Sequence, residues 1–540
     1  MRGIRAHRRA VAVVLALLVV TGCSRAGQDP PAAVQPPADT PIVVSARASG
    51  SRLLPGQATD PFTSRVVNLM FRGLVRHDAK GKAVNEVAES IDTDDSETFR
   101  VRLREAWTFS NGDPVTAASF VDAWNAAVRP GSGNRYANAF SSVLGFAAVH
   151  GSPGVAPRSR TMTGLTILDP RTFTISLTGP RPGFVNRLAH PAFAPLPPEA
   201  FGDPAGFASL PIGNGPYRLE QPWTGGPELT LRPNSSYPGT DRAQNAGLTF
   251  RVYPSPGRAY ADVQTGRLDV LDGVPVSVLG TFKDEFKLRA VNQPVGVTQS
   301  LVFPATSPVW GSPRGRRLRH AVASAINREA LSSQLFRGTR QPATDLASPV
   351  VEGHSDDACG QDCRFDPALA TAALRDAAGP PDGGLIIAYA ADGDDLTWVS
   401  PLCASITQTL GMPCRPTPVP TQAALATAVA AGTMTSPFVA TSTMAVADLS
   451  GFLDPRFLFG STDNDSSYPD RRTQQLLVIA QQTAPGARLP LYQEVTRRVL
   501  ADLPVVPLWS VNATAVSSQA VKGVKLDVFG VPVYQEITRP

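Results

Sequence analysis

The chain has 540 residues, of which 42% are hydrophobic and 18% are charged, and its formal net charge is +5 at pH 7. This composition is that of a globular protein, and the length is too great for a single hydrophobic core. Two or more lobes are therefore expected.

The first 23 residues form a segment with the features of an export signal. Four arginines lie at or before residue 9, and an unbroken apolar run of eleven residues follows, from Ala10 to Val20. As a helix this run would be about 16 Å long, too short to cross a hydrocarbon core of about 30 Å, so a signal peptide is favoured over a membrane anchor. Val20-Thr21-Gly22-Cys23 resembles the lipobox of bacterial lipoproteins, which implies cleavage before Cys23 and acylation of its thiol and new amine. The alternative is an ordinary cleavable signal peptide with an incidental cysteine.

Removal of residues 1–22 changes the charge balance. Four of the 50 basic residues lie in this segment and none of the 45 acidic residues does, so the remaining 518 residues carry 46 basic and 45 acidic groups, a net charge of +1. Nucleic acid is therefore not an indicated partner. Several acyl chains, at ~0.8 kcal/mol per buried methylene, would hold the protein at the outer face of the cytoplasmic membrane, in the periplasm or cell-wall space.

Four further cysteines are present, at Cys359, Cys363, Cys403 and Cys414. An even number in an exported chain predicts two disulfide bonds, and nearest-neighbour pairing is favoured among the three possible pairings. A metal site is the alternative, but C-x3-C is not a standard zinc-ribbon spacing and His354 is the only nearby histidine. Neither a metal nor a cofactor is expected.

The folded chain is expected to begin some twenty residues after Cys23. Residues 23–41 are predicted to be a tether, since 27–41 are rich in Pro, Ala, Gln and Asp without periodicity. A strand pattern follows at Ile42–Ala46, and period-two alternation predicts another strand at Thr98–Leu103. An Asn-Gly-Asp-Pro turn at 111–114 then precedes a helix that Thr116 is expected to cap.

A series of short motifs follows in a defined order along nearly the whole chain. They are Asp60-Pro61, Leu69-Met70-Phe71-Arg72-Gly73-Leu74, the tract 99–120, Leu168-Asp169-Pro170-Arg171-Thr172-Phe173, Pro211-Ile212-Gly213-Asn214-Gly215-Pro216-Tyr217, Gly266-Arg267-Leu268-Asp269-Val270, the helix 318–328, Asp366-Pro367 and Leu503-Pro504-Val505-Val506-Pro507-Leu508-Trp509. In this order they resemble the oligopeptide/dipeptide solute-binding proteins of ABC importers. The chain departs from that family at Arg72, Ser119 and Asn214, where Glu, Asp and Thr are usual.

The resemblance implies an α/β fold of the type II periplasmic-binding-protein class. Two lobes joined by a hinge are expected, with a subdomain inserted in lobe I, and the chain would cross between the lobes twice so that they can close over a ligand. The expected division is lobe I at 42–75, 160–300 and 500–540, the inserted subdomain at 76–159, and lobe II at 301–499.

The resemblance also implies a ligand-binding carboxylate. Met444–Leu449 followed by Asp454-Pro455 corresponds to the family's W-x-x-D-Y-x-D-P segment, in which the first Asp pairs with the α-amine of a peptide. This implies Asp448, beside Ala447, as the partner of a ligand ammonium, which needs a carboxylate when it is removed from water. Three extra residues separate Asp448 from Asp454 and the flanking aromatics are missing, so a loop-capping role for Asp448 remains open. Asp454 is expected to cap the following helix.

Three aromatic residues are further candidates for the site. Tyr136-Ala137 resembles a P-Y-A segment whose Tyr lines the peptide site, although packing in the core is an equal alternative for this ring. Trp398 and Trp509 are candidates for apolar pocket walls, with placement in the core as the favoured alternative.

No motif for catalysis is found. The chain lacks H-E-x-x-H, G-x-S-x-G, a Walker A loop and G-x-G-x-x-G. Gly353–Asp357 places His, Ser and Asp side by side, but a triad assembles from separate loops. The acidic turns at 94–97 and 392–395 do not fit EF-hand spacing. An enzyme is not expected, and an exported hydrolase remains an alternative without motif support.

The sequence therefore predicts a monomeric, lipid-anchored substrate-binding component of an ABC importer. It would capture short peptides between its lobes through their main-chain groups, for uptake through permease and ATPase subunits. The alternatives are the same fold binding haem, a metal chelate or a glycan, and a sensor or envelope-assembly lipoprotein that does not transport.

Overall fold

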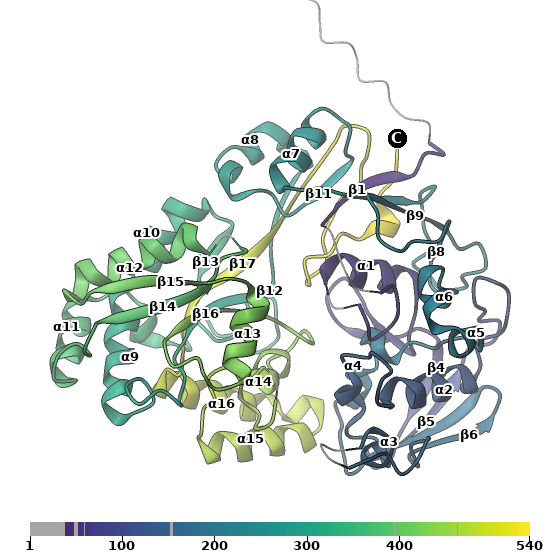
Figure 1. The fold of residues 1–540 in the computed structure, drawn as a ribbon, viewed down its shortest axis with the longest axis horizontal. Coiled ribbons are helices and arrows are strands. Elements are labelled where there is room, and N and C mark those ends of the chain that lie inside the picture. The colour runs from purple at the N-terminus through teal and green to yellow at the C-terminus, as the bar shows by residue number, and fades with distance from the viewer. Residues whose placement is uncertain (1–37, 48–51, 59, 152–154, 394, 462) are drawn as a thin grey trace, which may run out of the picture. The chain divides into compact units, whose positions relative to one another are not determined.

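The computed structural model describes residues 38–540 except 48–51, 59, 152–154, 394 and 462 (Figure 1). The predicted signal peptide, Cys23 and nearly all of the predicted tether lie outside the described residues. Residues 37–540 form one compact unit. Within the described part, no helix has both the length and the apolar character that crossing a membrane requires.

Most of the β structure lies in one sheet of eleven strands. Their order is β15-β14-β16-β12-β17-β11-β1-β10-β9-β8, with β13 paired to β17. The strands are β1 (Ile42–Ala46), β8 (Tyr217–Leu219), β9 (Glu228–Pro233), β10 (Leu248–Val252), β11 (Val270–Asp272), β12 (Ala290–Val302), β13 (Arg340–Pro342), β14 (Leu385–Ala390), β15 (Cys414–Val419), β16 (Phe438–Thr443) and β17 (Val505–Ser517). The first strand lies at the residues predicted for it.

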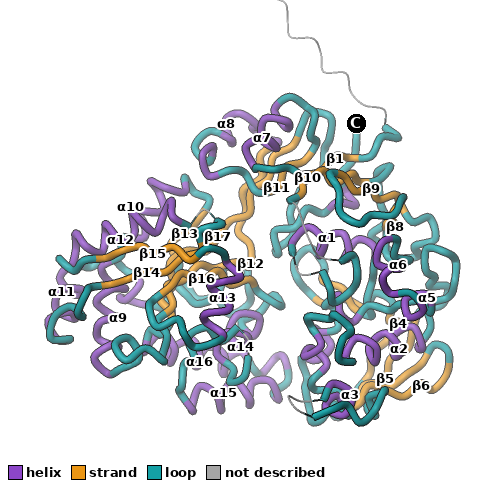
Figure 2. The backbone as a smooth tube through the Cα atoms, viewed as in Figure 1, coloured by secondary structure: helices purple, strands orange, loops and turns teal. Residues whose placement is uncertain are grey.

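Two long antiparallel strands, β12 and β17, connect the two groups of shorter strands (Figure 2). One end of the pair adjoins β11 and the other end adjoins β16. The register of the ladder shifts between Pro294 and Thr298, where proline has no amide hydrogen to donate. These strands provide the two chain crossings that a two-lobed fold requires.

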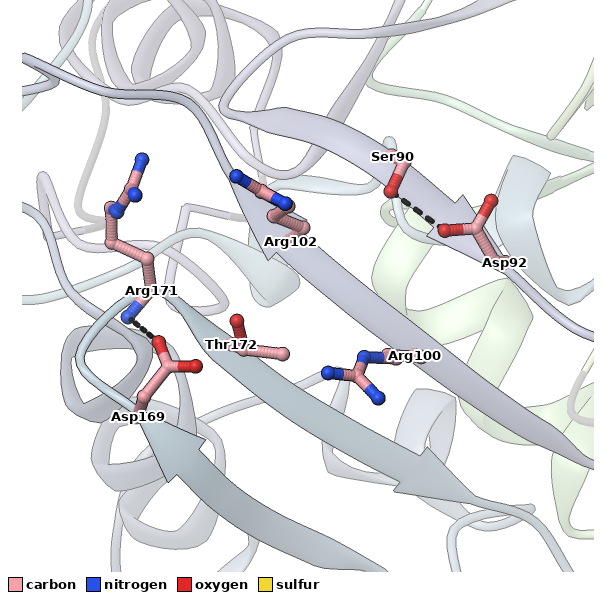
Figure 3. Close-up of a pocket in the computed structure, with 7 residues that line it drawn as sticks. All are labelled: Ser90, Asp92, Arg100, Arg102, Asp169, Arg171 and Thr172. Atoms are coloured by element: carbon pink, nitrogen blue, oxygen red, sulfur yellow. Dashed lines mark hydrogen bonds between the residues drawn. The ribbon is translucent and has the colours of Figure 1, made fainter.

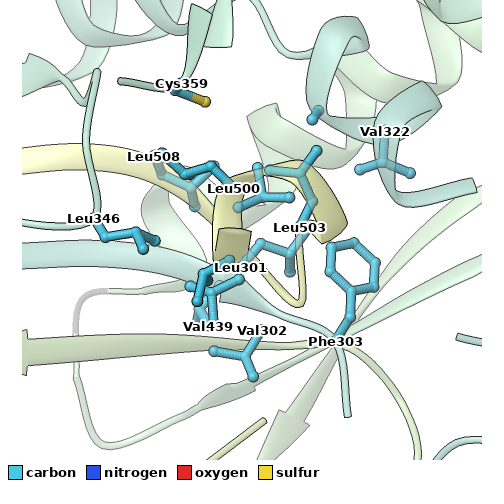
Figure 4. Packing of buried hydrophobic residues seen from close by; sticks show 14 of the residues in the cluster. Leu301, Val302, Phe303, Val322, Leu346, Cys359, Val439, Leu500, Leu503 and Leu508 are labelled. Atoms are coloured by element: carbon cyan, nitrogen blue, oxygen red, sulfur yellow. The ribbon is translucent and has the colours of Figure 1, made fainter. Parts of the chain in front are cut away.

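The half of the sheet beyond β12 is built from parallel strands covered by helices. β14 pairs in parallel with both β15 and β16, as alternating strands and helices favour. The helices are α9 (Pro313–Ala325), α10 (Arg328–Leu331), α11 (Pro367–Asp376), α12 (Leu396–Leu410), α13 (Gln422–Ala430), α14 (Ser450–Phe457), α15 (Arg471–Gln482) and α16 (Leu489–Asp502). Their apolar side chains form one large core with the sheet, which includes Leu301 and Phe303 beside Leu503 (Figure 4).

Both disulfide bonds lie in this half, and they join Cys359 to Cys363 and Cys403 to Cys414. This is the pairing that the sequence favours. The second bond links α12 to the first residue of the edge strand β15.

A separate antiparallel sheet has the order β4-β5-β7-β6. Its strands are β4 (Ala88–Asp92), β5 (Thr98–Leu103), β6 (Leu165–Asp169) and β7 (Thr172–Ser176). Exposed and buried residues alternate strictly along β5, as its period-two pattern predicts. α2 (Ala117–Val128) begins directly after its N-cap Thr116, where Ser119 completes a capping box. Trp124 of this helix packs in an aromatic core with Phe140, Phe173 and Phe193.

The expected end of the inserted subdomain at residue 159 does not coincide with the end of this packing unit. β6 and β7 both follow residue 159 and pair into the same sheet. Phe173 and Phe193 belong to the same core as Phe99. The unit therefore extends beyond 159, because β5 lacks a second neighbour until the chain returns at β7. The expected boundaries at 300 and 500 likewise fall inside β12 and α16.

The first half of the chain also contains short elements around β1 and the four-stranded sheet. They are α1 (Pro61–Met70), β2 (Val75–His77), β3 (Ala83–Asn85), α3 (Phe146–His150), α4 (Phe184–Arg187), α5 (Glu199–Gly202), α6 (Pro204–Ser209), α7 (Pro256–Gln264) and α8 (Phe282–Phe286). The loop 211–217 lies against the end of α1. There Asn214, which is fully buried, exchanges hydrogen bonds of 2.9 Å with the backbone N–H and C=O of Arg72.

Candidate ligand-binding site

Asp448 lies just before α14, and each of its carboxylate oxygens already has a partner. Oδ1 accepts hydrogen bonds from the backbone N–H of Ser450 at 2.8 Å and from the Ser450 hydroxyl. Oδ2 pairs with Nη2 of Arg488 at 2.5 Å. Asp448 therefore holds the turn that leads into α14, whose N-cap is Leu449, and also forms an ion pair with a residue 40 positions away.

Asp454 does not cap a helix, so that expectation is wrong. It lies inside α14, and its carboxylate accepts hydrogen bonds from Gln481 Nε2 at 2.9 Å and from the Tyr492 hydroxyl at 3.1 Å. Burial raises the pKa of Asp454 to about 6, although these hydrogen bonds and the charge of Arg187 act in the opposite direction. The pKa of this carboxyl group therefore lies well above that of an ordinary aspartate.

The residues facing this carboxylate come from the segment that follows β7. Arg181 donates a hydrogen bond of 3.1 Å from Nη1 to Gln481 Oε1. A Cβ added to Gly183 would lie 2.8 Å from Nη1 of Arg488, so the two segments touch there. Arg187 in α4 is exposed, yet desolvation by the surrounding protein lowers its pKa, while the carboxylate of Asp454 raises it.

We name these residues the polar junction: Arg181, Gly183, Arg187, Asp448, Asp454, Gln481, Arg488 and Tyr492. Its two sides belong to different hydrophobic cores. Phe184 and Leu188, which flank Arg187, pack in the core of the four-stranded sheet, whereas Leu453 and Tyr492 pack in the core around β12 and β17. At this junction the two sides thus meet through hydrogen-bonding and charged groups.

Tyr136 lies on the same side as Arg187. Its half-buried ring packs against the ring of His190, with 4.5 Å between the centroids. Burial raises the pKa of Tyr136, and the negative charge of Asp463 acts in the same direction. Burial also lowers the pKa of His190 to about 4, helped by the charge of Arg187, so this imidazole is neutral at pH 7. Tyr136 therefore packs against its own core beside His190.

Ala447 lies at a neighbouring contact. Its Cβ occupies the space that a side chain at Gly81 would need, and Val528 borders the same space. His77 packs close by against Phe529, with 5.2 Å between ring centroids. Ala447 thus lies where its segment contacts the turn at Gly81 and the segment at Val528.

Trp398 and Trp509 do not line a pocket in this structure. Their side chains are 1% and 0% exposed, and the two indoles pack edge to face with 6.2 Å between ring centroids. Because both rings lie inside the core, the expectation of pocket walls is wrong, and the core alternative describes them.

Two hollows among the described residues lie elsewhere. One of about 470 Å³ lies on the four-stranded sheet and is lined by Ser90, Asp92, Arg100, Arg102, Asp169, Arg171 and Thr172 (Figure 3). Another of about 460 Å³ lies beside the Cys359–Cys363 disulfide and includes Arg328 and Phe365. Neither hollow contains a residue of the polar junction. Among the described residues, no three His, Cys, Asp or Glu side chains are grouped as a metal site would need.

Sequence reasoning misses the basic half of the polar junction. Arg181, Arg187 and Arg488 lie in no motif, and the pairing of Arg488 with Asp448 joins helix termini that are distant along the chain. The one available signal is that Asp448 has lost the flanking aromatics usual in the family, which leaves room for another partner.

Comparison with known proteins identifies the family. The model described as "Bacterial extracellular solute-binding proteins, family 5 Middle" matches residues 82–433, which is more than half of the chain. The chain belongs to this family. As a family 5 solute-binding protein it is 27% identical over 346 residues to the glutathione-binding protein GsiB of Salmonella paratyphi A. That match covers 63% of this chain and 62% of the relative, so it spans less than two thirds of the relative's length.

Solved structures show the same fold over nearly the whole chain. The murein tripeptide binding protein MppA of Escherichia coli has a TM-score of 0.76 at 19% identity, covering 92% of this chain and 98% of MppA. OppA of Haemophilus influenzae in complex with RPPGFSPFR has a TM-score of 0.73 at 21% identity, covering 92% of this chain and 98% of OppA. These likenesses establish the periplasmic-binding-protein fold predicted from the sequence.

Proposed function

We propose that this family 5 protein is the substrate-binding component of an ABC importer for short peptides. The protein would be a monomer held by an acylated Cys23 at the outer face of the cytoplasmic membrane, and would deliver its ligand to permease and ATPase subunits. It would catalyse no reaction itself. The observation that carries the proposal is the polar junction, where charged side chains beside one hydrophobic core meet charged side chains beside another.

A peptide has the charges that this junction can hold. A carboxylate has about four acceptor positions, and Asp448 uses three of them, on Ser450 and Arg488. One position remains for a ligand ammonium, whose positive charge would then be shared with that of Arg488. On the facing side, the guanidinium of Arg187 offers a partner for a ligand carboxylate. Tyr136 and Ala447 would flank the peptide backbone.

The relatives define which peptides to try first. One is named a glutathione-binding protein and one a murein tripeptide binding protein. Both names indicate short peptides with more than one carboxylate, and the junction has three arginines against two carboxylates. We therefore expect tripeptides with an acidic side chain to bind more tightly than their neutral counterparts.

The first experiment is native mass spectrometry of the protein purified without added ligand. A series of co-purified short-peptide masses is expected. A single non-peptide mass, such as haem, would contradict the proposal, and isothermal titration with glutathione and acidic tripeptides would follow if the protein is empty.

The Asp448→Ala variant tests the ammonium site. It should weaken peptide binding by ~2 kcal/mol or more, because the ligand ammonium would be left without its carboxylate. The matched control is Glu494→Ala, which removes an exposed carboxylate from a surface pair with Arg497 in α16. Equal affinity in both variants would remove Asp448 from the site.

A further inference from the structure

Leu288 is the most exposed apolar side chain in the described part of the chain. Its relative exposure is 103%, whereas no other large hydrophobic residue described exceeds 52%. It follows α8 in the short turn Lys287–Arg289, and we name residues 283–289 the α8 tip. A fully exposed leucine buries no apolar surface within the fold, so its side chain is free to contact another surface.

The α8 tip is held in place on both sides. Phe282 and Phe286 are buried beneath it, and Arg289 donates a hydrogen bond to the carbonyl of Ser517 while its guanidinium lies 5.0 Å from the Phe286 ring centroid. Lys287 has a φ of 52°, a left-handed conformation that is unfavourable for L-residues. The backbone therefore ends α8 abruptly and directs the next residue away from the core.

Two exposed lysines, Lys283 and Lys287, precede the leucine within five residues. Lys283 Nζ lies 3.9 Å from the position of a Cβ added at Gly338, and among the described residues neither ammonium has a hydrogen-bond or ion-pair partner. Of the two acidic residues on the tip, Glu285 accepts hydrogen bonds from Tyr260 and Gln264 of α7 at 2.7 and 2.9 Å, while Asp284 is exposed. An exposed apolar side chain next to a free lysine is typical of contact with an anionic lipid surface.

The α8 tip lies at the end of the molecule where the folded chain begins. Val43 of β1 packs on the same apolar cluster as Phe282 and Phe286, and β1 pairs with β11, which precedes α8 (Figure 1). Only 18 residues separate Ile42 from Cys23. Even fully extended they would span no more than about 65 Å, so an acylated Cys23 would tether the molecule to the bilayer from this end without fixing its orientation.

We propose that the α8 tip is a second membrane contact, with Leu288 entering the headgroup region and Lys283 and Lys287 adjacent to lipid phosphates. One acyl anchor on a long tether leaves a protein free to rotate. A second contact fixes which end of the molecule faces the bilayer, and thereby the orientation in which ligand is presented. The inference rests on the proposed acylation of Cys23 and is independent of the ligand.

The experiment places a single spin label at the α8 tip. The lipidated full-length protein with Leu288→Cys is bound to phosphatidylcholine–phosphatidylglycerol vesicles, since its other cysteines are in disulfides or acylated. Collision with oxygen, which enriches in lipid, is compared with collision with a water-soluble nickel chelate. The matched control is Leu396→Cys, another exposed leucine at 51%, at the start of α12.

The spin label at residue 288 is expected to collide more often with oxygen than with the chelate, whereas the label at residue 396 should show no such preference. Because each lysine near an anionic surface contributes about a fivefold increase in binding, Lys283→Glu with Lys287→Glu should abolish the difference, as should 1 M salt, where the Debye length is about 3 Å. Equal accessibility at 288 and 396 would overturn the proposal, and so would protection that needs added permease rather than lipid. Protein that is not retained on vesicles at all would instead contradict the acylation of Cys23.

Discussion

At the scale of single residues, burial changes the pKa of Asp454 in the polar junction more than its hydrogen bonds do. Asp454 has two hydrogen-bond donors, yet its pKa is raised because desolvation outweighs them. Arg187 helps to keep the carboxyl group ionised through its positive charge. The protonation state of Asp454 therefore depends on the positive charge of Arg187.

Replacing Arg187 with Gln should raise the pKa of Asp454 above about 6, because a charge that favours the carboxylate is removed. The measurement is an NMR titration of ¹³Cγ-labelled aspartates, with Asp454→Asn assigning the signal. Arg497→Gln, on the exposed side of α16, is the control and should leave the titration unchanged. An equal pKa in wild type and Arg187→Gln would show that the two groups do not interact.

The raised pKa also predicts a pH dependence of stability. A carboxyl group with an ordinary pKa near 4 in the unfolded chain and about 6 in the folded chain binds more protons when folded between these values. Its contribution to the free energy of unfolding is therefore lost as the pH rises from about 4 to about 6. The thermal unfolding temperatures of the wild type and of Asp454→Asn, plotted against pH, should diverge between about pH 4 and about pH 6. Parallel plots would argue against a raised pKa of Asp454.

At the scale of elements, close backbone approach fixes the loop 211–217 against α1. A Cβ added to Gly215 would lie 2.6 Å from the carbonyl oxygen of Leu69, which is backbone and cannot move aside. The two-way hydrogen bonds between Asn214 and Arg72 hold the same contact. Asn in place of the family's Thr is thus used to satisfy both backbone groups of Arg72.

Gly215→Ala should lower the free energy of unfolding by about 1–3 kcal/mol, as overpacking does. Gly202→Ala is the matched control, because a Cβ there meets nothing within 4 Å, and its effect should be within about 0.5 kcal/mol. Denaturant midpoints monitored by tryptophan fluorescence give the comparison. Similar midpoints for the two variants would mean that the loop can shift away from α1.

The disulfides provide a second prediction at this scale. The Cys403–Cys414 bond closes a longer segment than Cys359–Cys363, with separations of 11 and 4 residues. Loop entropy predicts losses of about 3 and about 2 kcal/mol when each pair is replaced by alanine. Denaturant unfolding of the two double variants tests the order, and a larger loss for Cys359→Ala/Cys363→Ala would contradict an entropic origin.

At the scale of the whole molecule, β12 and β17 link the two groups of strands in the large sheet, and the polar junction brings side chains beside the core of the four-stranded sheet into contact with side chains beside the core around β12 and β17. The strands are covalently continuous, whereas the junction consists of side-chain contacts that water can replace. Ligand that bridges the junction should therefore favour a closed arrangement of the lobes.

Small-angle X-ray scattering with and without a bound peptide should show this closure. A single compact body of about 500 residues has a radius of gyration of about 23 Å. We expect the value without ligand to exceed this and to fall when a saturating peptide is added. Arg181→Ala with Arg488→Ala should reduce the change, since both remove contacts across the junction. An unchanged radius on saturation would contradict hinge closure.

The sequence by itself determined the family, the fold class and many local elements. The alternation in β5, the Thr116 cap and the strand at Ile42–Ala46 follow from short-range rules, because the residues involved are neighbours along the chain. The pairing of cysteines also follows from nearness in sequence. The assignment of Asp448 to a ligand ammonium stays a prediction.

Only the tertiary structure decided which distant groups meet. Arg488 pairs with Asp448, Trp398 packs on Trp509, and β7 completes a sheet begun before residue 159, each through contacts between segments far apart in the chain. No local pattern encodes such a contact, because a side chain's surroundings are set by packing rather than by its neighbours in sequence. For the same reason Asp454 resembles a helix cap in the sequence, whereas its carboxyl group lies within α14 beside Gln481 and Tyr492.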